Sequence, residues 1–178
     1  SQFKNWSKRT NTKKHWKHID GFPLEIKEQI TLKTFDEDTS PTLHGGVFNL
    51  VLTNKPYNVT RFYVHAVKEW LHSFEKDSFD VVIIEGAFMG YYLPIAKVIG
   101  KHTILRSHNL EHLIWQRTQA KQRNPLKKLY FQLQSNRLKN FEERLAKMCD
   151  SIWSISPVDS FWFIEFNSNC HFIPVSVE

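Results

Sequence analysis

The chain has 178 residues, of which 41% are hydrophobic and 24% charged, a balance typical of one folded domain. No apolar run approaches the roughly 18 residues that a membrane-spanning helix needs, and no secretory pattern opens the sequence at Ser1. Cys149 and Cys170 belong to no disulfide or zinc motif, so the sequence favours a reducing cytoplasm.

The charge is unevenly distributed. The formal net charge is +6, and residues 117–147 contain nine Lys or Arg against Glu142 and Glu143 alone. Such a surplus indicates an anionic partner, either a nucleic acid, a nucleotide diphosphate or a membrane surface. The aromatic side chains of this region recur at core spacing and are not set out for base stacking, so we expect no nucleic acid partner.

The N-terminal part of the chain predicts one strand and two helices. Residues 29–35 are rich in β-branched side chains and lead into a polar loop, which favours a strand. Residues 43–53 predict an apolar helix. A second helix is expected over residues 60–76, where Phe62, Val67 and Trp70 belong to a broad apolar face.

The rest of the chain alternates strands with helices. Phe79-Asp-Val-Val-Ile-Ile84 is nearly continuous in apolar residues, as in a strand buried on both faces of a parallel sheet. The further elements expected are a helix over 91–99, a strand over 103–106, a helix opening at 108–109, a helix over 124–149, a strand over 151–156, a helix over 157–166 and a strand over 171–175. This order predicts an α/β fold in which a Rossmann-like open parallel sheet carries helices on both faces, spanning residues 1–178 as a single domain.

Ligands of such sheets bind outside the carboxyl ends of the strands. Polar residues follow three of the predicted strands, at Glu85-Gly86, at Arg106-Ser-His-Asn-Leu-Glu-His112 and at Ser156. The first could equally be a plain turn, and Asn109 and Ser156 could be helix caps. His108 precedes the expected cap, so we expect it to face a ligand, with Glu85, Gly86, Arg106, Asn109, Glu111 and Ser156 as substrate-binding candidates.

Other chemistries fit the sequence less well. His108 and His112 form an H-x-x-E-H pattern with Glu111, as in inverted zinc peptidases, but that motif needs both histidines within one helix. We therefore expect no metal site. The sequence has no G-x-G-x-x-G, no P-loop and no G-x-S-x-G elbow, which argues against a dinucleotide cofactor or a hydrolase and leaves an α/β ligand-binding module.

Four segments taken together resemble the retaining GT-B glycosyltransferases of the glycosyltransferase group 1 family. They are Phe79-Asp-Val-Val-Ile-Ile-Glu85, Leu105-Arg-Ser-His-Asn-Leu-Glu-His112, Asn124-Pro-Leu-Lys-Lys-Leu-Tyr130 and Asp150-Ser-Ile-Trp-Ser-Ile-Ser156. The resemblance implies the N-terminal, acceptor-side domain of a two-domain enzyme. It also implies that His108 reaches toward the donor sugar while Glu85, Arg106 and Asn109 line the acceptor side.

The implied reaction moves a sugar from a nucleotide-sugar donor to a hydroxyl of a glycan or lipid-linked glycan, without a cofactor. Relative to the family, the first strand and its Gly-rich loop have no counterpart, residues 173–178 match the interdomain hinge only loosely, and the donor-binding C-terminal domain is absent. We therefore expect the chain alone to be inactive. Lipid-linked acceptors and clustered bases also make the inner membrane face a candidate location. The alternative that stays open is a non-catalytic α/β binding module.

Overall fold

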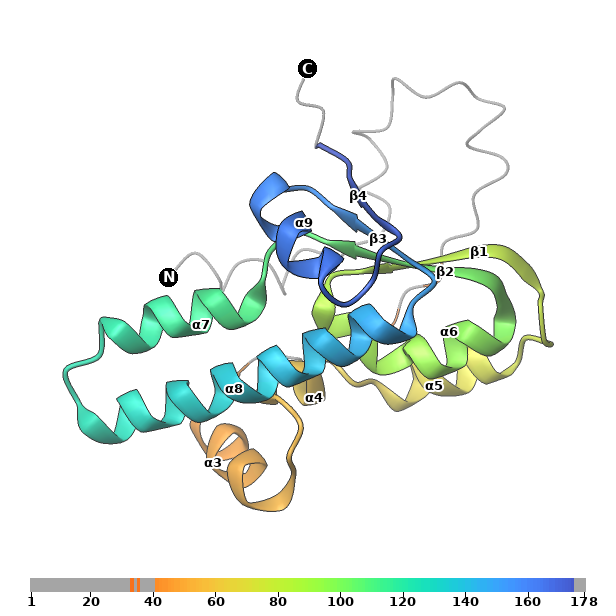
Figure 1. Cartoon of the computed structure of the whole chain (residues 1–178). Coiled ribbons are helices and arrows are strands. Elements are labelled where there is room, and N and C mark those ends of the chain that lie inside the picture. Colours follow the sequence, from red (N-terminus) through yellow and green to blue (C-terminus); the bar gives the residue numbers. More distant parts are fainter. Residues whose placement is uncertain (1–32, 34, 36–40, 175–178) are drawn as a thin grey trace, which may run out of the picture. The chain divides into compact units, whose positions relative to one another are not determined.

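The computed structural model describes residues 33, 35 and 41–174 (Figure 1). The chain divides into two compact units, Ser1–Ser40 and Pro41–Glu178, and the fold given below is that of the second. Apart from Lys33 and Phe35, the strand predicted over residues 29–35 lies outside the described residues, and so does most of the predicted hinge.

The second unit is built on a parallel sheet of four strands in the order β1-β2-β3-β4. The strands are β1 (Phe79–Glu85), β2 (Gly100–Ser107), β3 (Ser151–Ser154) and β4 (Cys170–Phe172). The helices are α3 (Leu43–Leu52), α4 (Tyr57–Arg61), α5 (His65–His72), the 3-10 helix η3 (Ala87–Tyr92), α6 (Leu93–Ile99), α7 (Glu111–Ala120), α8 (Pro125–Met148) and α9 (Pro157–Ile164). The prediction of a Rossmann-like open α/β sheet is confirmed.

The helices that follow the strands share one core. Ile84, Leu105 and Ile152 are aligned across β1, β2 and β3 and point to the same face of the sheet. They pack there with Leu93 of α6, with Leu145 of α8 and with other apolar residues of α6, α8 and α9. Since the strands advance in one direction and such crossovers are right-handed, their helices must lie on one side. Figure 1 shows α6 and α8 on the same side of the sheet. We expected helices on both faces of the sheet. Within residues 41–174, the helices that follow the strands lie on one face.

Strand β1 is more exposed than its sequence suggests. Val81 and Ile83 alternate with the core-facing residues and are 48% and 45% exposed. Within the described residues β1 pairs with β2 alone, so it is an edge strand whose second face is open. The prediction that this strand is buried on both faces is wrong, because an apolar run does not distinguish a central strand from an edge strand.

The prediction of a single helix over residues 60–76 is wrong, because the structure has two short helices, α4 and α5. Between them Val64 is extended, and its backbone N–H donates to the hydroxyl of Tyr92 at 2.7 Å. The ring of Phe62 stacks on that of Phe88, with 5.5 Å between the ring centroids. These contacts with η3 satisfy the backbone and side chains at the break, so tertiary packing overrides the helical pattern.

Helix α8 runs for 24 residues and begins where the sequence predicts, with Asn124 as its N-cap accepting from the backbone of Leu126 and Lys127. Its middle holds α3 and α4 in place. The buried amide of Gln134 accepts from Tyr57 N at 2.9 Å and donates to Asn49 at 3.0 Å. Arg137 donates to the carbonyl of Leu50 at 3.0 Å.

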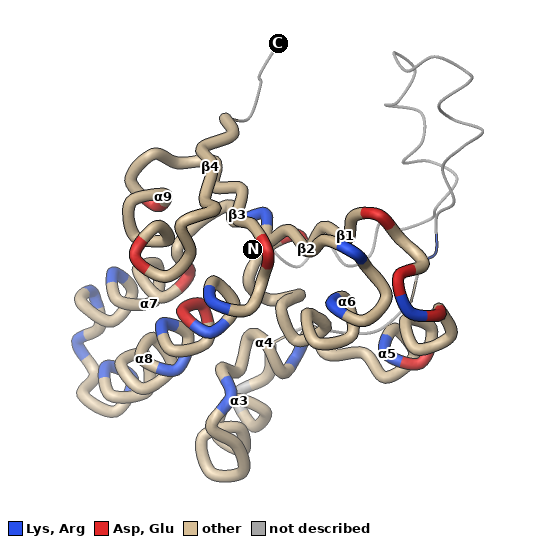
Figure 2. Tube along the Cα trace, turned by 45° about the vertical axis from the view of Figure 1, so that its right-hand side comes forward, with Lys and Arg blue, Asp and Glu red and all other residues tan. Residues whose placement is uncertain are grey.

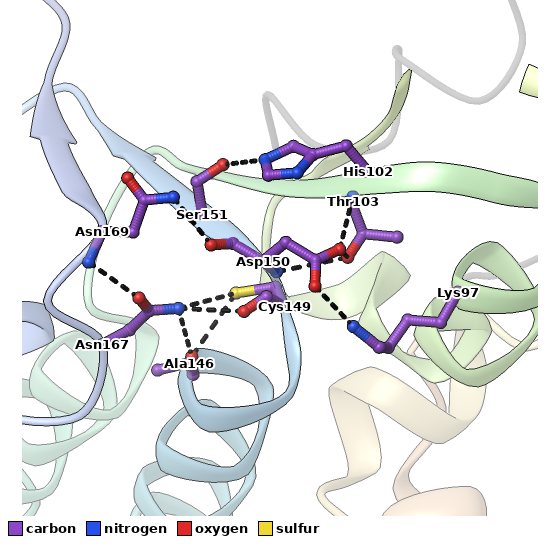
Figure 3. Close-up of polar contacts among 9 residues, drawn as sticks. All are labelled: Lys97, His102, Thr103, Ala146, Cys149, Asp150, Ser151, Asn167 and Asn169. Carbon is purple, nitrogen blue, oxygen red and sulfur yellow. Dashed lines mark hydrogen bonds and ion pairs between the residues drawn. The ribbon is translucent and has the colours of Figure 1, made fainter. Parts of the chain in front are cut away.

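A polar network at the amino ends of the strands fixes the junction of α8 with β3 (Figure 3). One oxygen of Asp150 accepts from both the backbone N and the hydroxyl of Thr103, at 2.8 and 2.6 Å, and the other binds Lys97 at 2.8 Å. Asn167 donates to the carbonyls of Ala146 and Cys149, both at 2.9 Å. These contacts lie at the edge of the sheet opposite to the carboxyl ends of its strands and have a structural role.

Candidate functional site

The candidate site is at the carboxyl ends of β1 and β2. Glu85 is the last residue of β1 and stands directly opposite Arg106 of β2 in the parallel register. One guanidinium nitrogen of Arg106 donates to Glu85 Oε1 at 3.0 Å. Both side chains remain partly open to solvent, so the pair can meet a ligand approaching this edge.

His108 completes a cluster of three side chains. It follows β2 directly, and its Nε2 lies 2.7 Å from the second oxygen of Glu85. The imidazole and the carboxylate are each about half exposed, at 47% and 51%. The structure thus brings together Glu85, Arg106 and His108, which we call the carboxyl-end cluster.

The cluster controls the ionisation of Glu85. Burial of the carboxyl acts to raise its pKa, but the hydrogen bonds from His108 and Arg106, together with their positive charge, act in the other direction and prevail. The pKa of Glu85 is therefore lower than its ordinary value, and the group is a carboxylate at neutral pH. A carboxylate has about four acceptor positions, so two hydrogen bonds leave room for the hydroxyl groups of a ligand.

Gly86 turns the chain away from the sheet directly after Glu85. Its φ of 76° and ψ of 159° lie in a region that is essentially restricted to glycine. Its N–H donates to the carbonyl of Arg106 at 2.8 Å. A Cβ built on Gly86 would meet no atom within 4 Å, so the glycine is required by its backbone conformation and not by a close neighbour.

The start of α7 differs from the prediction. The helix begins at Glu111, its N-cap is Leu110, and Leu110 has no capping side chain. Asn109, predicted as a cap or a ligand contact, is exposed and accepts through its backbone carbonyl from the Ser107 hydroxyl at 3.1 Å. The cap is supplied from α8 by Glu142, whose carboxylate accepts from Glu111 N at 2.8 Å.

Glu142 is the residue of this region that the sequence interpretation missed. Its side chain is fully buried, and its second oxygen lies 2.7 Å from His112 Nδ1. The ring of His112 also packs against Trp162, with centroids 5.0 Å apart. The position of Glu142, four residues after Leu138 and three before Leu145 in the apolar row, was the available signal, because a carboxylate on a buried face requires a partner.

Glu111 belongs to this second, more buried environment. The pKa of Glu111 is raised to about 7, by burial first and by the nearby carboxylate of Glu142 second, while His108 opposes the shift. Glu111, which interacts with both His108 and the buried Glu142, therefore changes its charge near neutral pH.

The zinc-peptidase alternative fails on geometry. Its motif needs two histidines on one helix face, but His108 lies before α7 and points to Glu85, whereas His112 lies inside α7 and points to Glu142. Within residues 33, 35 and 41–174, no three His, Cys, Asp or Glu side chains are grouped as a metal site would require.

Ser156 lies after β3 and serves helix α9. Its side chain accepts from the backbone N of Asp159 at 3.4 Å as the N-cap, and its carbonyl accepts from the Ser160 hydroxyl at 3.0 Å. Of the predicted site residues, Glu85, Arg106 and His108 are joined by hydrogen bonds and Gly86 adjoins them. Among the described residues no hydrogen bond connects Asn109 or Ser156 with the cluster.

No helix among the described residues is both long and apolar enough to cross a bilayer. Comparisons of the chain with protein-family models, with curated proteins and with solved structures give no match.

Proposed function

We propose that the chain is the acceptor-binding domain of a glycosyltransferase and that the carboxyl-end cluster contacts the reacting sugars. The observation that carries the proposal is the hydrogen bond of 2.7 Å between His108 and Glu85, at the solvent-exposed carboxyl edge of a parallel sheet. Sugars are recognised through hydroxyl groups, which both donate and accept hydrogen bonds. Glu85 supplies acceptors, and Arg106 and His108 supply donors.

The proposed reaction is transfer of a sugar with retained configuration. The bond between the anomeric carbon and the diphosphate oxygen breaks, and the acceptor oxygen forms the new bond to that carbon on the same face. The acceptor proton leaves with the diphosphate. A cation near the cleaving bond stabilises the developing charge, and His108 reaches from the acceptor-binding domain toward the donor sugar, as the family resemblance implies. The donor would be held by the C-terminal domain that the family resemblance implies.

The test is a binding experiment on the 178-residue chain. A panel of mono- and oligosaccharides is screened by saturation-transfer NMR, and each hit is titrated against the chain and against Glu85→Gln and His108→Ala. We expect at least one saccharide to bind and both variants to weaken it by about tenfold, the scale of one lost hydrogen bond to a charged group.

The matched control is His65→Ala, which removes an exposed histidine that also pairs with a glutamate, Glu69, but on α5. This variant is expected to bind the saccharide as the unaltered chain does. The proposal fails if no saccharide binds, or if the cluster variants bind as tightly as the control.

A further inference from the structure

A second surface, remote in sequence from the carboxyl-end cluster, combines exposed apolar side chains with positive charge. It consists of α3 and the first half of α8, and we call it the α3/α8 surface. Val51 and Leu52 of α3 are 80% and 73% exposed, and Leu126 and Leu129 of α8 are 77% and 53% exposed. Large aliphatic side chains this open to water are costly unless a partner covers them.

Val47 of α3 and Leu126 of α8 connect the apolar side chains of the two helices. Leu126, Leu129 and Leu133 recur at three and four residues, so they follow one row along α8. Val47 of α3 lines the same open cavity of about 680 Å³ as Leu126 and Lys127. The two helices are therefore adjacent where their apolar residues are exposed, as Figure 1 shows for the ribbons.

The surface is rigid because α3 is tied to α8. Gln134 and Arg137 bind Asn49 and the carbonyl of Leu50, as described above. Gly46 lets the two helices approach closely, since a Cβ at this position would lie 2.8 Å from the Tyr130 hydroxyl. The apolar residues of α3 are thus held beside those of α8 before any partner binds.

The charge around this surface has one sign. Residues 41–68 contain three Lys or Arg and residues 112–141 contain seven, and neither segment contains Asp or Glu. Lys121, Arg123, Lys127 and Lys128 are all exposed at the turn from α7 and in the first turn of α8. Figure 2 shows Lys and Arg along α7 and the first half of α8, with acidic residues of α8 only in its second half.

From these features we infer that the α3/α8 surface docks on an anionic lipid bilayer. Aliphatic side chains enter the interface between headgroups and acyl chains, while the surrounding bases attract anionic headgroups. This inference goes beyond the proposed function and does not depend on which reaction the carboxyl-end cluster serves.

Two other occupants fit less well. A second copy of the chain would place the same bases opposite one another across a symmetric interface, and like charges in that position are unfavourable. A nucleic acid fits the charge but not the apolar residues. Single-stranded binding stacks successive bases on several exposed aromatic rings, whereas Trp115, Tyr130 and Phe131 pack on one another here, and Phe48 of α3, 62% exposed, offers a single ring.

The experiment is flotation of the 178-residue chain with vesicles made of equal parts phosphatidylcholine and phosphatidylglycerol, and with vesicles of phosphatidylcholine alone. We expect binding to the anionic vesicles that weakens with added salt, and much weaker binding to the neutral ones. The double variant Lys127→Glu with Lys128→Glu should bind at least about 25-fold less tightly, since each base near the surface contributes about fivefold.

Two single variants test the apolar contribution. Val51→Glu and Leu126→Glu are expected to lower binding by about tenfold or more, the scale of one aliphatic side chain moved out of water. The control is Val158→Glu on α9, where the side chain is 72% exposed. For charge, the control is Lys76→Glu, whose side chain is 79% exposed. Both controls should bind vesicles like the unaltered chain, and circular dichroism should show all variants folded.

The inference is overturned if the chain ignores anionic vesicles, or if the control variants lose as much binding as the α3/α8 variants. It is also overturned if the chain binds a mixed-sequence RNA instead of the vesicles, and if the lysine variants weaken this RNA binding while Leu126→Glu does not. Failure here is distinguishable from failure of the proposed function, because Leu126→Glu should still bind saccharide and Glu85→Gln should still bind vesicles.

Discussion

Glu142 of α8 holds the first turn of α7 through His112, accepting from its ring Nδ1 at 2.7 Å and from its backbone N–H at 3.2 Å. The same carboxylate accepts from the backbone N of Glu111. One buried side chain therefore caps a helix that its own neighbouring residues leave uncapped. The polypeptide that carries His108 leads directly into this turn.

Replacing Glu142 by Ala is expected to lower the free energy of unfolding by about 3–5 kcal/mol, because it leaves His112 and two backbone N–H groups buried without their acceptor. Glu142→Gln keeps an acceptor oxygen and should cost less. Urea denaturation followed by circular dichroism measures both. Equal stability of the Ala variant and the unaltered chain would show that the buried contact does not stabilise the fold.

The contacts within the carboxyl-end cluster predict a change in the pKa of Glu85 that can be measured without a ligand. The pKa of Glu85 is held low by hydrogen bonds from His108 and Arg106 against the opposing effect of burial. His108→Ala removes one of these donors, so the pKa of Glu85 should rise. NMR titration of the Glu85 side-chain carbon checks this. His65→Ala is the control and should leave that titration unchanged.

Glu111 should make stability fall as the solution becomes more basic. Its pKa is raised from 4.5 to about 7 in the folded chain. Between these values the unfolded state releases a proton that the folded state retains, so the free energy of unfolding decreases as pH rises from about 4.5 to 7. Glu111→Gln removes this penalty and should stabilise the chain above pH 7 by about 1–3 kcal/mol, since one pKa unit is about 1.4 kcal/mol. Urea denaturation at several pH values measures the free energy of unfolding of Glu111→Gln and of the unaltered chain. The same dependence on pH in both proteins would contradict this prediction.

Asp150 should have the opposite effect on how stability depends on pH. The pKa of Asp150 is lowered to about 2, because hydrogen bonds from Lys97 and Thr103 outweigh the effect of burial. A lowered carboxyl pKa stabilises the fold above the ordinary value of 3.8, and this contribution disappears as pH falls toward 2. The side chain is partly exposed, so we expect a contribution of only about 1 kcal/mol.

Thermal unfolding of Asp150→Asn between pH 5 and pH 2 tests this pH dependence. The variant should start less stable than the unaltered chain and lose less on acidification. Parallel acid profiles for the two proteins would mean that Asp150 is not the group responsible. A matched control is Asp77→Asn, which changes a partly exposed Asp that lies 4.0 Å from Lys76 on the surface.

Under the proposed function, the 178-residue chain should bind acceptor without transferring sugar, because that proposal assigns donor binding to a second domain. Incubation with a panel of nucleotide sugars and any saccharide found to bind, followed by mass spectrometry of the saccharide, should show no added sugar. Measurable transfer by the purified chain would contradict this division of the site.

The sequence predicted the elements whose pattern is local. Helix α8 has a capping Asn124 and a long apolar row, and both mark its start and its buried side without reference to the rest of the chain. Strands β1, β2 and β3 were expected because their apolar runs are short and bounded by turns. The break between α4 and α5 was missed, since it depends on the Tyr92 hydroxyl, 28 residues away from Val64.

The same distinction holds for the candidate site. Glu85, Arg106 and His108 could be predicted because they follow strands, and parallel strands end at a common edge. Asn109 was predicted as a cap on its residue type, but the cap comes from Glu142, 31 residues from Glu111. No rule based on neighbouring residues identifies such a partner, because it results from how α7 and α8 pack.

The length of α8 has a consequence for where a reaction could take place. Leu126 lies on the proposed lipid side, and Glu142 lies where α7 begins, just beyond His108. At about 1.5 Å per residue the two positions are separated by roughly 24 Å along the helix. With a bilayer docked on the α3/α8 surface, the first turn of α7 would therefore lie within about 24 Å of the level of Leu126. An acceptor anchored in the bilayer would need a linker between its lipid and its hydroxyl no longer than α8 for that hydroxyl to reach His108.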